Sequence, residues 1–114
     1  MLLTACNGSS YPFDAGGDVE FNVVKANVGA EITYKNSSGK HIDVLSYNLY
    51  TYAENGIQLD SFSYTDGDMS AGDEKLQPVI LSDVVNYVII EVVSIDAEGE
   101  QKILNLQSEE FIMK

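Results

Sequence analysis

The densest group of carboxylates in the chain includes Asp66, Asp68 and Asp73, whose oxygens are the kind of ligand that Ca²⁺ prefers. An EF-hand loop that began at Asp66 would need Gly at its sixth position and Glu at its twelfth. The sequence has Ala71 and Gln77 at these positions, so the loop is not an EF-hand. Two interpretations stay open: an irregular Ca²⁺ site, or an exposed acidic turn that joins two edge strands.

Groups for acid–base or nucleophilic catalysis are scarce. His41 is the only His and Cys6 the only Cys, whereas a catalytic triad or a zinc site needs further partners. The acids fall mostly at turns and at alternating strand positions, where solvation explains them better than a pair of carboxylates across a cleft. We therefore predict that the protein is not an enzyme and uses no cofactor.

Tyrosine is the most prominent residue type with binding chemistry, with seven in the chain. Tyr50 and Tyr52 share one face of an expected strand, and Tyr64 lies on its expected hairpin partner. Together they form a candidate aromatic surface for a peptide or a glycan. The alternative is that the rings pack between the sheets with their hydroxyls at the rim, and the chain has no Trp, the residue typical of carbohydrate platforms.

Cys6 has a different chemistry. The residues Leu3-Thr4-Ala5-Cys6 resemble the cleavage box of bacterial lipoprotein signals, in which the Cys becomes the first residue and carries a diacylglyceryl group. A full signal has a basic start and an apolar stretch of roughly 7–15 residues, so we expect residues 1–5 to be the end of a longer signal. The alternative is a lone apolar Cys near the terminus.

The segment after this Cys contains Gly, Ser and Pro without a regular hydrophobic period. Such composition is typical of a flexible linker. We expect residues 6–17 to be a lipid-anchored tether and residues 18–114 to be the folded domain. The corresponding location is the extracellular face of a bacterial cell membrane.

Charge restricts the partners. The chain has 18 acidic residues against six Lys and no Arg, which gives a net charge of -12. Nucleic acid is excluded because phosphate binding needs a cationic surface. Anionic lipid headgroups would also repel the domain, so membrane attachment falls to the acyl chains on Cys6. A cell-surface protein or a glycan remains as the candidate ligand.

From Asp18 onward apolar and polar residues alternate with period two, and no helical period is found. This pattern predicts seven strands around the apolar positions Val19–Val23, Ile32–Tyr34, His41–Ala53, Ile57–Thr65, Lys75–Leu81, Val84–Ile95 and Lys102–Met113. The fourth has mixed faces and the fifth contains Pro78, so both are expected at sheet edges. The sixth is the most apolar and is expected in the centre, covered on both faces.

Seven short strands with turns between them predict an all-β, immunoglobulin-like β-sandwich of antiparallel strands in two sheets. A single Cys excludes an internal disulfide, so packing alone must hold the two sheets together.

Three segments of the chain stand out: residues 32–40, which end a strand in Asn36 and a polar turn, the aromatic-rich residues 50–56, and the small-residue, Gly and acidic turn of residues 69–74. In this order they resemble the FxLYD-type and related immunoglobulin-like domains of secreted and lipid-anchored bacterial proteins. The chain departs from the family at Ala53, where the family tends to place Asp. The resemblance implies a non-enzymatic extracytoplasmic module and carries over no functional residue.

Three hypotheses for function follow from the sequence. The first is a lipid-anchored binding or accessory module outside the membrane. The second is a structural protein that pairs with itself or with a partner through an exposed edge strand. The third is a Ca²⁺-stabilised cell-surface domain.

Overall fold

The computed structural model describes residues 11–114, and all regular structure in this part of the chain is β-strand. The nine strands are β2 (Phe13–Ala15), β3 (Val19–Ala26), β4 (Gly29–Asn36), β5 (Ile42–Tyr52), β6 (Gln58–Met69), β7 (Glu74–Ile80), β8 (Tyr87–Ala97), β9 (Glu100–Gln107) and β10 (Phe111–Ile112). The described residues contain no helix that is long and apolar enough to cross a membrane.

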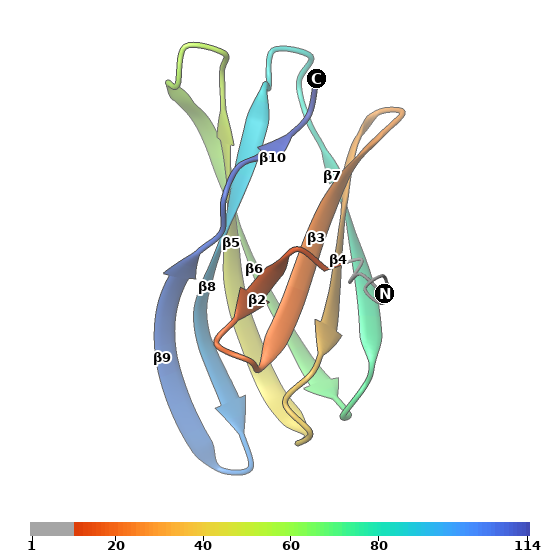
Figure 1. The fold of residues 1–114 in the computed structure, drawn as a ribbon, viewed down its shortest axis with the longest axis vertical. Helices are drawn as coiled ribbons and strands as arrows, with labels where there is room; N and C mark the ends of the chain where they lie inside the picture. Colours follow the sequence, from red (N-terminus) through yellow and green to blue (C-terminus); the bar gives the residue numbers. More distant parts are fainter. Residues whose placement is uncertain (1–10) are drawn as a thin grey trace, which may run out of the picture.

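The strands form two antiparallel sheets that face each other (Figure 1). One sheet has the order β2-β3-β4-β7, and the other has the order β10-β8-β5-β6 with β9 also paired to β8. The series β3-β4-β7 and β9-β8-β5-β6 correspond to the A-B-E and G-F-C-C′ strands of an immunoglobulin sandwich. The predicted fold class is confirmed, with β2 added before the seven expected strands and the last of these divided into β9 and β10.

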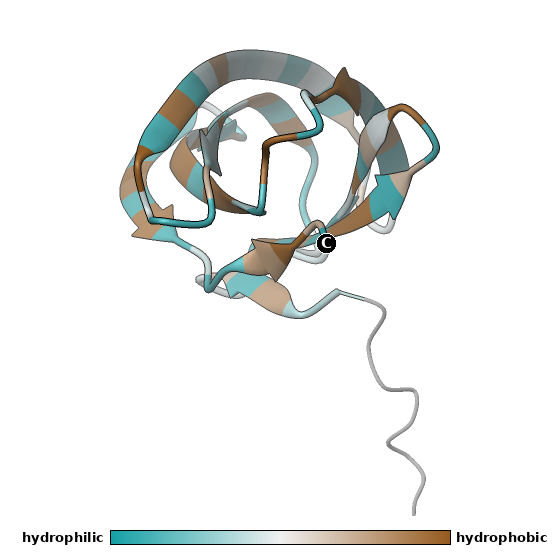
Figure 2. Cartoon of the chain, turned by 90° about the horizontal axis from the view of Figure 1, so that it is seen from above, coloured by the Kyte–Doolittle hydropathy of each residue, from teal (hydrophilic) through white to brown (hydrophobic). Residues whose placement is uncertain are grey.

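Side-chain alternation decides what each sheet buries. In β3 and β4 the predicted inward residues Val19, Phe21, Val23, Ile32 and Tyr34 are all buried. Leu45, Tyr47 and Leu49 of β5 are buried in the same way from the opposite sheet. Seen from above, the ribbons close around this shared interior (Figure 2).

Aromatic rings fill the middle of the core. The ring centroid of Tyr47 lies 5.1 Å from Phe21, 5.3 Å from Tyr34 and 5.2 Å from Tyr64. Phe21 and Tyr34 stack at 5.3 Å. Offset and edge-to-face contacts at such distances are favourable, so these rings join the two sheets without a disulfide.

Both predicted edge strands are edges, since β6 and β7 each end the order of a sheet. The acidic segment between them differs from the expectation. Asp66 and Asp68 belong to β6, which runs on to Met69, and only Ser70–Asp73 form the turn into β7. The sequence pattern missed this extension because Asp and Gly are uncommon in strands.

The ends of the domain also differ from the expectation. Phe13–Ala15, assigned to the tether, form β2 and pair with β3, and Ala15 is fully buried. The expected last strand is divided into β9 and β10 at Ser108, whose Oγ accepts the N–H of Ile90 at 3.0 Å. A side chain thus replaces a backbone acceptor in the ladder, and the strand breaks there.

The expected central strand begins later than predicted, at Tyr87, and is covered on one face only. Val88, Ile90 and Val92 are buried, whereas Tyr87, Ile89 and Glu91 on the opposite face are half-buried. Val84 precedes the strand and is 59% exposed. No described element packs over the outer face of this sheet, which therefore carries the accessible side chains of β5 and β8.

Candidate binding surface on the outer sheet face

Tyr50 and Tyr52 lie on this outer face and not between the sheets, which is the first of the two arrangements that the sequence left open. Tyr52 is directly opposite Tyr87 of β8, and the two rings stack with centroids 4.9 Å apart and planes within 9° of parallel. Tyr50 is opposite Ile89. The three tyrosines form a half-exposed aromatic strip that crosses β5 and β8.

A polar group adjoins this strip. The Tyr50 hydroxyl donates a hydrogen bond to Glu91 Oε1 at 2.6 Å, and Asn48 Nδ2 donates to the same oxygen at 3.1 Å. Asn48 and Glu91 are cross-strand partners, and Gln107 of β9 is opposite Glu91. We call Asn48, Tyr50, Tyr52, Tyr87 and Glu91 the tyrosine face.

These hydrogen bonds change the ionisation of both main partners. The bond from Tyr50, with a second from Asn48, lowers the pKa of Glu91 below its ordinary value, which keeps this carboxylate charged. The same bond raises the pKa of Tyr50 and keeps its hydroxyl protonated. The tyrosine face therefore offers a carboxylate acceptor, an amide and two stacked rings to a ligand.

Tyr64 is not part of this surface. It is directly opposite Tyr47 across β5 and β6 and stacks on that ring, which points it toward the core. Its ring is half-buried and packs against the buried cluster. The structure thus brings together two of the three predicted tyrosines and adds Tyr87 in place of the third.

The predicted acidic candidates serve separate contacts. Asp66 accepts the hydroxyl of Tyr34 at 2.5 Å and the N–H of Gly67 at 2.7 Å, and Lys75 Nζ lies 3.4 Å away. Burial raises the pKa of Asp66, but the hydrogen bonds from Tyr34 and Gly67 and the charge of Lys75 outweigh it, so the net pKa is lowered. Asp66 therefore joins β6, at the open edge of one sheet, to β4 and β7 of the other sheet, and we call its contacts with Tyr34 and Lys75 the clip.

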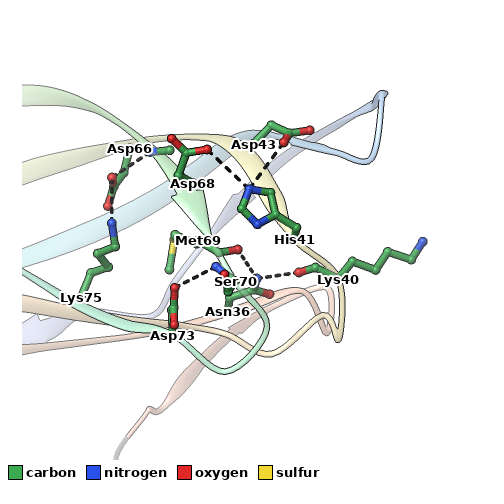
Figure 3. A network of polar contacts seen from close by, with 11 residues as sticks. Asn36, Lys40, His41, Asp43, Asp66, Asp68, Met69, Ser70, Asp73 and Lys75 are labelled. Atoms are coloured by element: carbon green, nitrogen blue, oxygen red, sulfur yellow. Dashed lines mark hydrogen bonds and ion pairs between the residues drawn. The ribbon is translucent and has the colours of Figure 1, made fainter.

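Asp68 and Asp73 point elsewhere (Figure 3). Asp68 Oδ1 lies 3.5 Å from Nε2 of His41, which is also 3.6 Å from Asp43, and all three side chains are exposed. Asp73 accepts the N–H of Ser70 within its own turn at 2.8 Å. In residues 11–114 no group of three or more His, Cys, Asp or Glu side chains is placed to hold a metal ion.

Asn36 has a structural role that sequence reasoning saw only as the end of a strand. Its side chain is 1% exposed, and Nδ2 donates to the carbonyls of Lys40 at 2.7 Å and Met69 at 2.9 Å (Figure 3). Its Oδ1 accepts the N–H and hydroxyl of Ser38. One side chain thus ties the end of β4 to the start of β5 and the end of β6.

Sequence reasoning overlooked Asn48, Tyr87 and Glu91. One signal was present: Glu91 is the only charged residue in the most apolar run, Val84–Ile95. A lone carboxylate in such a run indicates a position on the open face of a half-covered strand. Cys6, the predicted lipid attachment point, lies outside the described residues.

Comparison of the chain with models of protein families, with curated proteins and with solved structures found no significant match.

Proposed function

We propose that this protein is a lipid-anchored, non-enzymatic β-sandwich module on the outer side of a bacterial cell membrane, and that it binds a cell-surface protein or glycan through the tyrosine face. The observation that carries the binding role is the cluster of Tyr50, Tyr52 and Tyr87 beside Glu91 on a sheet face that no described element covers. Large rings with polar tips are the side chains that contribute most to binding energy at interfaces.

The anchor is supported by the sequence. The box Leu3-Thr4-Ala5-Cys6 places a lipidation site five residues before Tyr11, the first described residue, and the resemblance to FxLYD-type domains fits the same location. Because the net charge of -12 opposes anionic headgroups, acyl chains are the means of attachment.

Intact mass and detergent partitioning of the protein, expressed from its genomic locus in its native host, test the anchor. We expect a chain that begins at Cys6, is heavier by a diacylglyceryl group and enters the detergent phase, whereas Cys6→Ser stays in the aqueous phase. An unmodified, water-soluble wild-type chain would contradict the anchor and the location together.

Binding is tested with purified cell-wall glycan fragments and with surface protein extracts immobilised separately. Tyr52→Ala removes half of the stacked pair, and we expect at least a tenfold loss of affinity for the fraction that wild type binds. Ser46→Ala, on the same sheet face beyond Asn48, is the matched control and should bind as wild type. Equal binding by Tyr52→Ala and wild type would show that the ligand uses another surface.

A further inference from the structure

One edge of the sandwich is long, regular and unpaired. From Asp60 to Asp66, β6 pairs with β5 residue for residue, and its other side has no partner strand among the described residues. An unpaired edge presents a row of free backbone N–H and C=O groups to another chain.

The remaining edges are short or interrupted, whereas the irregularities of β6, a register shift before Asp60 and Asp68 at a φ of 53°, lie outside Asp60–Asp66. β2 and β10 have three and two residues. β7 contains Pro78, whose ring removes a donor from the ladder. β9 has a register shift against β8, with Asn105 at a φ of 49°. β6 has neither proline nor lysine, two of the residues that natural proteins use to protect an edge, and Ser61–Thr65 carry no charge.

The hydrogen bond of the Asp60 N–H shows which backbone N–H and C=O groups of β6 face away from β5. This N–H donates to Oγ1 of Thr51 on β5 at 2.9 Å, so the backbone groups of Asp60 face β5. Because backbone direction alternates along an extended strand, the N–H and C=O groups of Ser61 and Ser63 face the open side. A strand laid along β6 would pair with these two residues.

Side chains beside this edge are incompletely covered. Phe62 and Tyr64 pack against the core but remain half-buried, since no strand lies beyond them. Apolar side chains of an added strand would cover both rings. On the outer face Ser61 is opposite Tyr50, so the added strand would also continue the sheet that carries the tyrosine face.

The charge of β6 and of the whole chain indicates which kind of strand would pair with this edge. The charged residues of β6 are Asp60, Asp66 and Asp68, and the strand contains no cation. Two copies of a chain with a net charge of -12 repel each other, which disfavours pairing with itself. A basic segment is attracted by the net charge of the domain and by Asp60, whereas Asp66 is already paired with Lys75.

We propose that β6 binds an extended basic peptide, with alternating apolar and Lys or Arg residues, as an additional strand of the sheet. This inference rests on the proposed binding role and names the partner as a peptide segment of a protein.

The test uses an acetylated and amidated peptide of eight residues that alternates Val with Lys, added to the full folded protein. We expect the backbone amide NMR signals of Ser61 and Ser63 to shift and their hydrogen exchange to slow at submillimolar to millimolar peptide. A peptide with Glu in place of Lys should bind at least tenfold more weakly. No change along β6 at millimolar Val-Lys peptide would overturn the inference.

Ser63→Pro removes an outward N–H and should weaken binding of the Val-Lys peptide at least tenfold. Leu76→Pro places a proline on the β7 edge instead and should bind as wild type; the thermal melts of both variants check the fold. If Ser63→Pro does not fold, the amide shifts and exchange rates of wild type decide the question.

Two further outcomes separate this inference from the proposed function. Peptide shifts confined to Tyr50 and Tyr52, with β6 unchanged, would overturn the edge site and leave the tyrosine face standing. If hydrogen exchange at the Ser61 and Ser63 amides slows as the protein concentration is raised without peptide, the edge pairs with a second copy of the chain. This result would overturn the proposal of a basic peptide.

Discussion

At the scale of single residues, two tyrosine hydroxyls in the core have opposite environments. The Tyr34 hydroxyl donates to the Asp66 carboxylate at 2.5 Å, and burial together with this bond raises the pKa of Tyr34. The Tyr47 hydroxyl is buried and has no hydrogen-bond partner. Burial raises the pKa of Tyr47 as well.

Tyr34→Phe should lower the free energy of unfolding by about 1–3 kcal/mol, because it removes a hydrogen bond to a charged group at the clip between the sheets. Tyr47→Phe is the matched control, because it removes the same hydroxyl oxygen from a ring whose hydroxyl has no hydrogen-bond partner. It should leave stability unchanged or raise it, since an unsatisfied buried polar group is costly. Urea unfolding of both variants measures this, and a larger loss in Tyr47→Phe would contradict the assignment.

The hydrogen bond between Tyr34 and Asp66 also predicts how the free energy of unfolding depends on pH in the acid range. The folded pKa of Asp66 lies below its unfolded value of about 3.9, so its stabilisation is complete well above that pH. It is lost as the pH falls through the folded pKa. As the pH falls from about 5 to about 2, the range in which Asp66 becomes protonated, the free energy of unfolding of Tyr34→Phe should therefore decrease less than that of wild type. Parallel acid profiles of the two proteins would contradict the clip.

At the scale of strands, register decides which predictions from sequence succeed. Alternation within each strand predicted the buried residues of β3, β4 and β5, because a half-covered strand has a period of two. It could not relate the faces of two strands. Leu49 pairs with Phe62, so even-numbered residues point outward in β5 and inward in β6, and Tyr64 faces the core while Tyr50 does not. A change of one residue in register would exchange those faces.

Features that depend on partners far away in the sequence could not be predicted from local patterns. Ser108 ends β9 by bonding Ile90, and Phe13–Ala15 become a strand only by pairing with β3, so neither event has a local signal. The tyrosine face was half predicted for the same reason. Tyr50 and Tyr52 share a strand, whereas Tyr87 and Glu91 join them from a strand some 35 to 40 residues away in sequence.

Asn36 shows how one side chain coordinates several strands. Asn36→Ala should lower the free energy of unfolding by about 2–4 kcal/mol, because the carbonyls of Lys40 and Met69 and the N–H of Ser38 lose their partner. Ser38→Ala removes one of the bonds to Asn36 and two exposed bonds with the backbone of Lys40, and it should cost less than half as much because exposed groups bond water instead. Chemical unfolding gives both values, and equal losses would show that Asn36 is not the common partner.

At the scale of the whole molecule, the net charge of -12 acts on every surface at once. Eighteen acids against six lysines on one small domain repel each other, and this repulsion destabilises the folded state. Salt screens charges over a distance of about 10 Å at 0.1 M ionic strength, so it should relieve the repulsion. The few ion pairs on the surface, such as Lys102 with Asp18 at 2.7 Å, oppose this effect only weakly.

The melting temperature should therefore rise with NaCl concentration. Asp66, Asp68 and Asp73 are held by different partners, so CaCl₂ should raise the melting temperature no more than MgCl₂ at the same ionic strength. The comparison between the two divalent salts separates general screening from a specific site. A rise with Ca²⁺ that Mg²⁺ does not reproduce would mean that the three carboxylates rearrange around the ion, and the contacts of Asp66 with Tyr34 and Lys75 would have to break for this to happen.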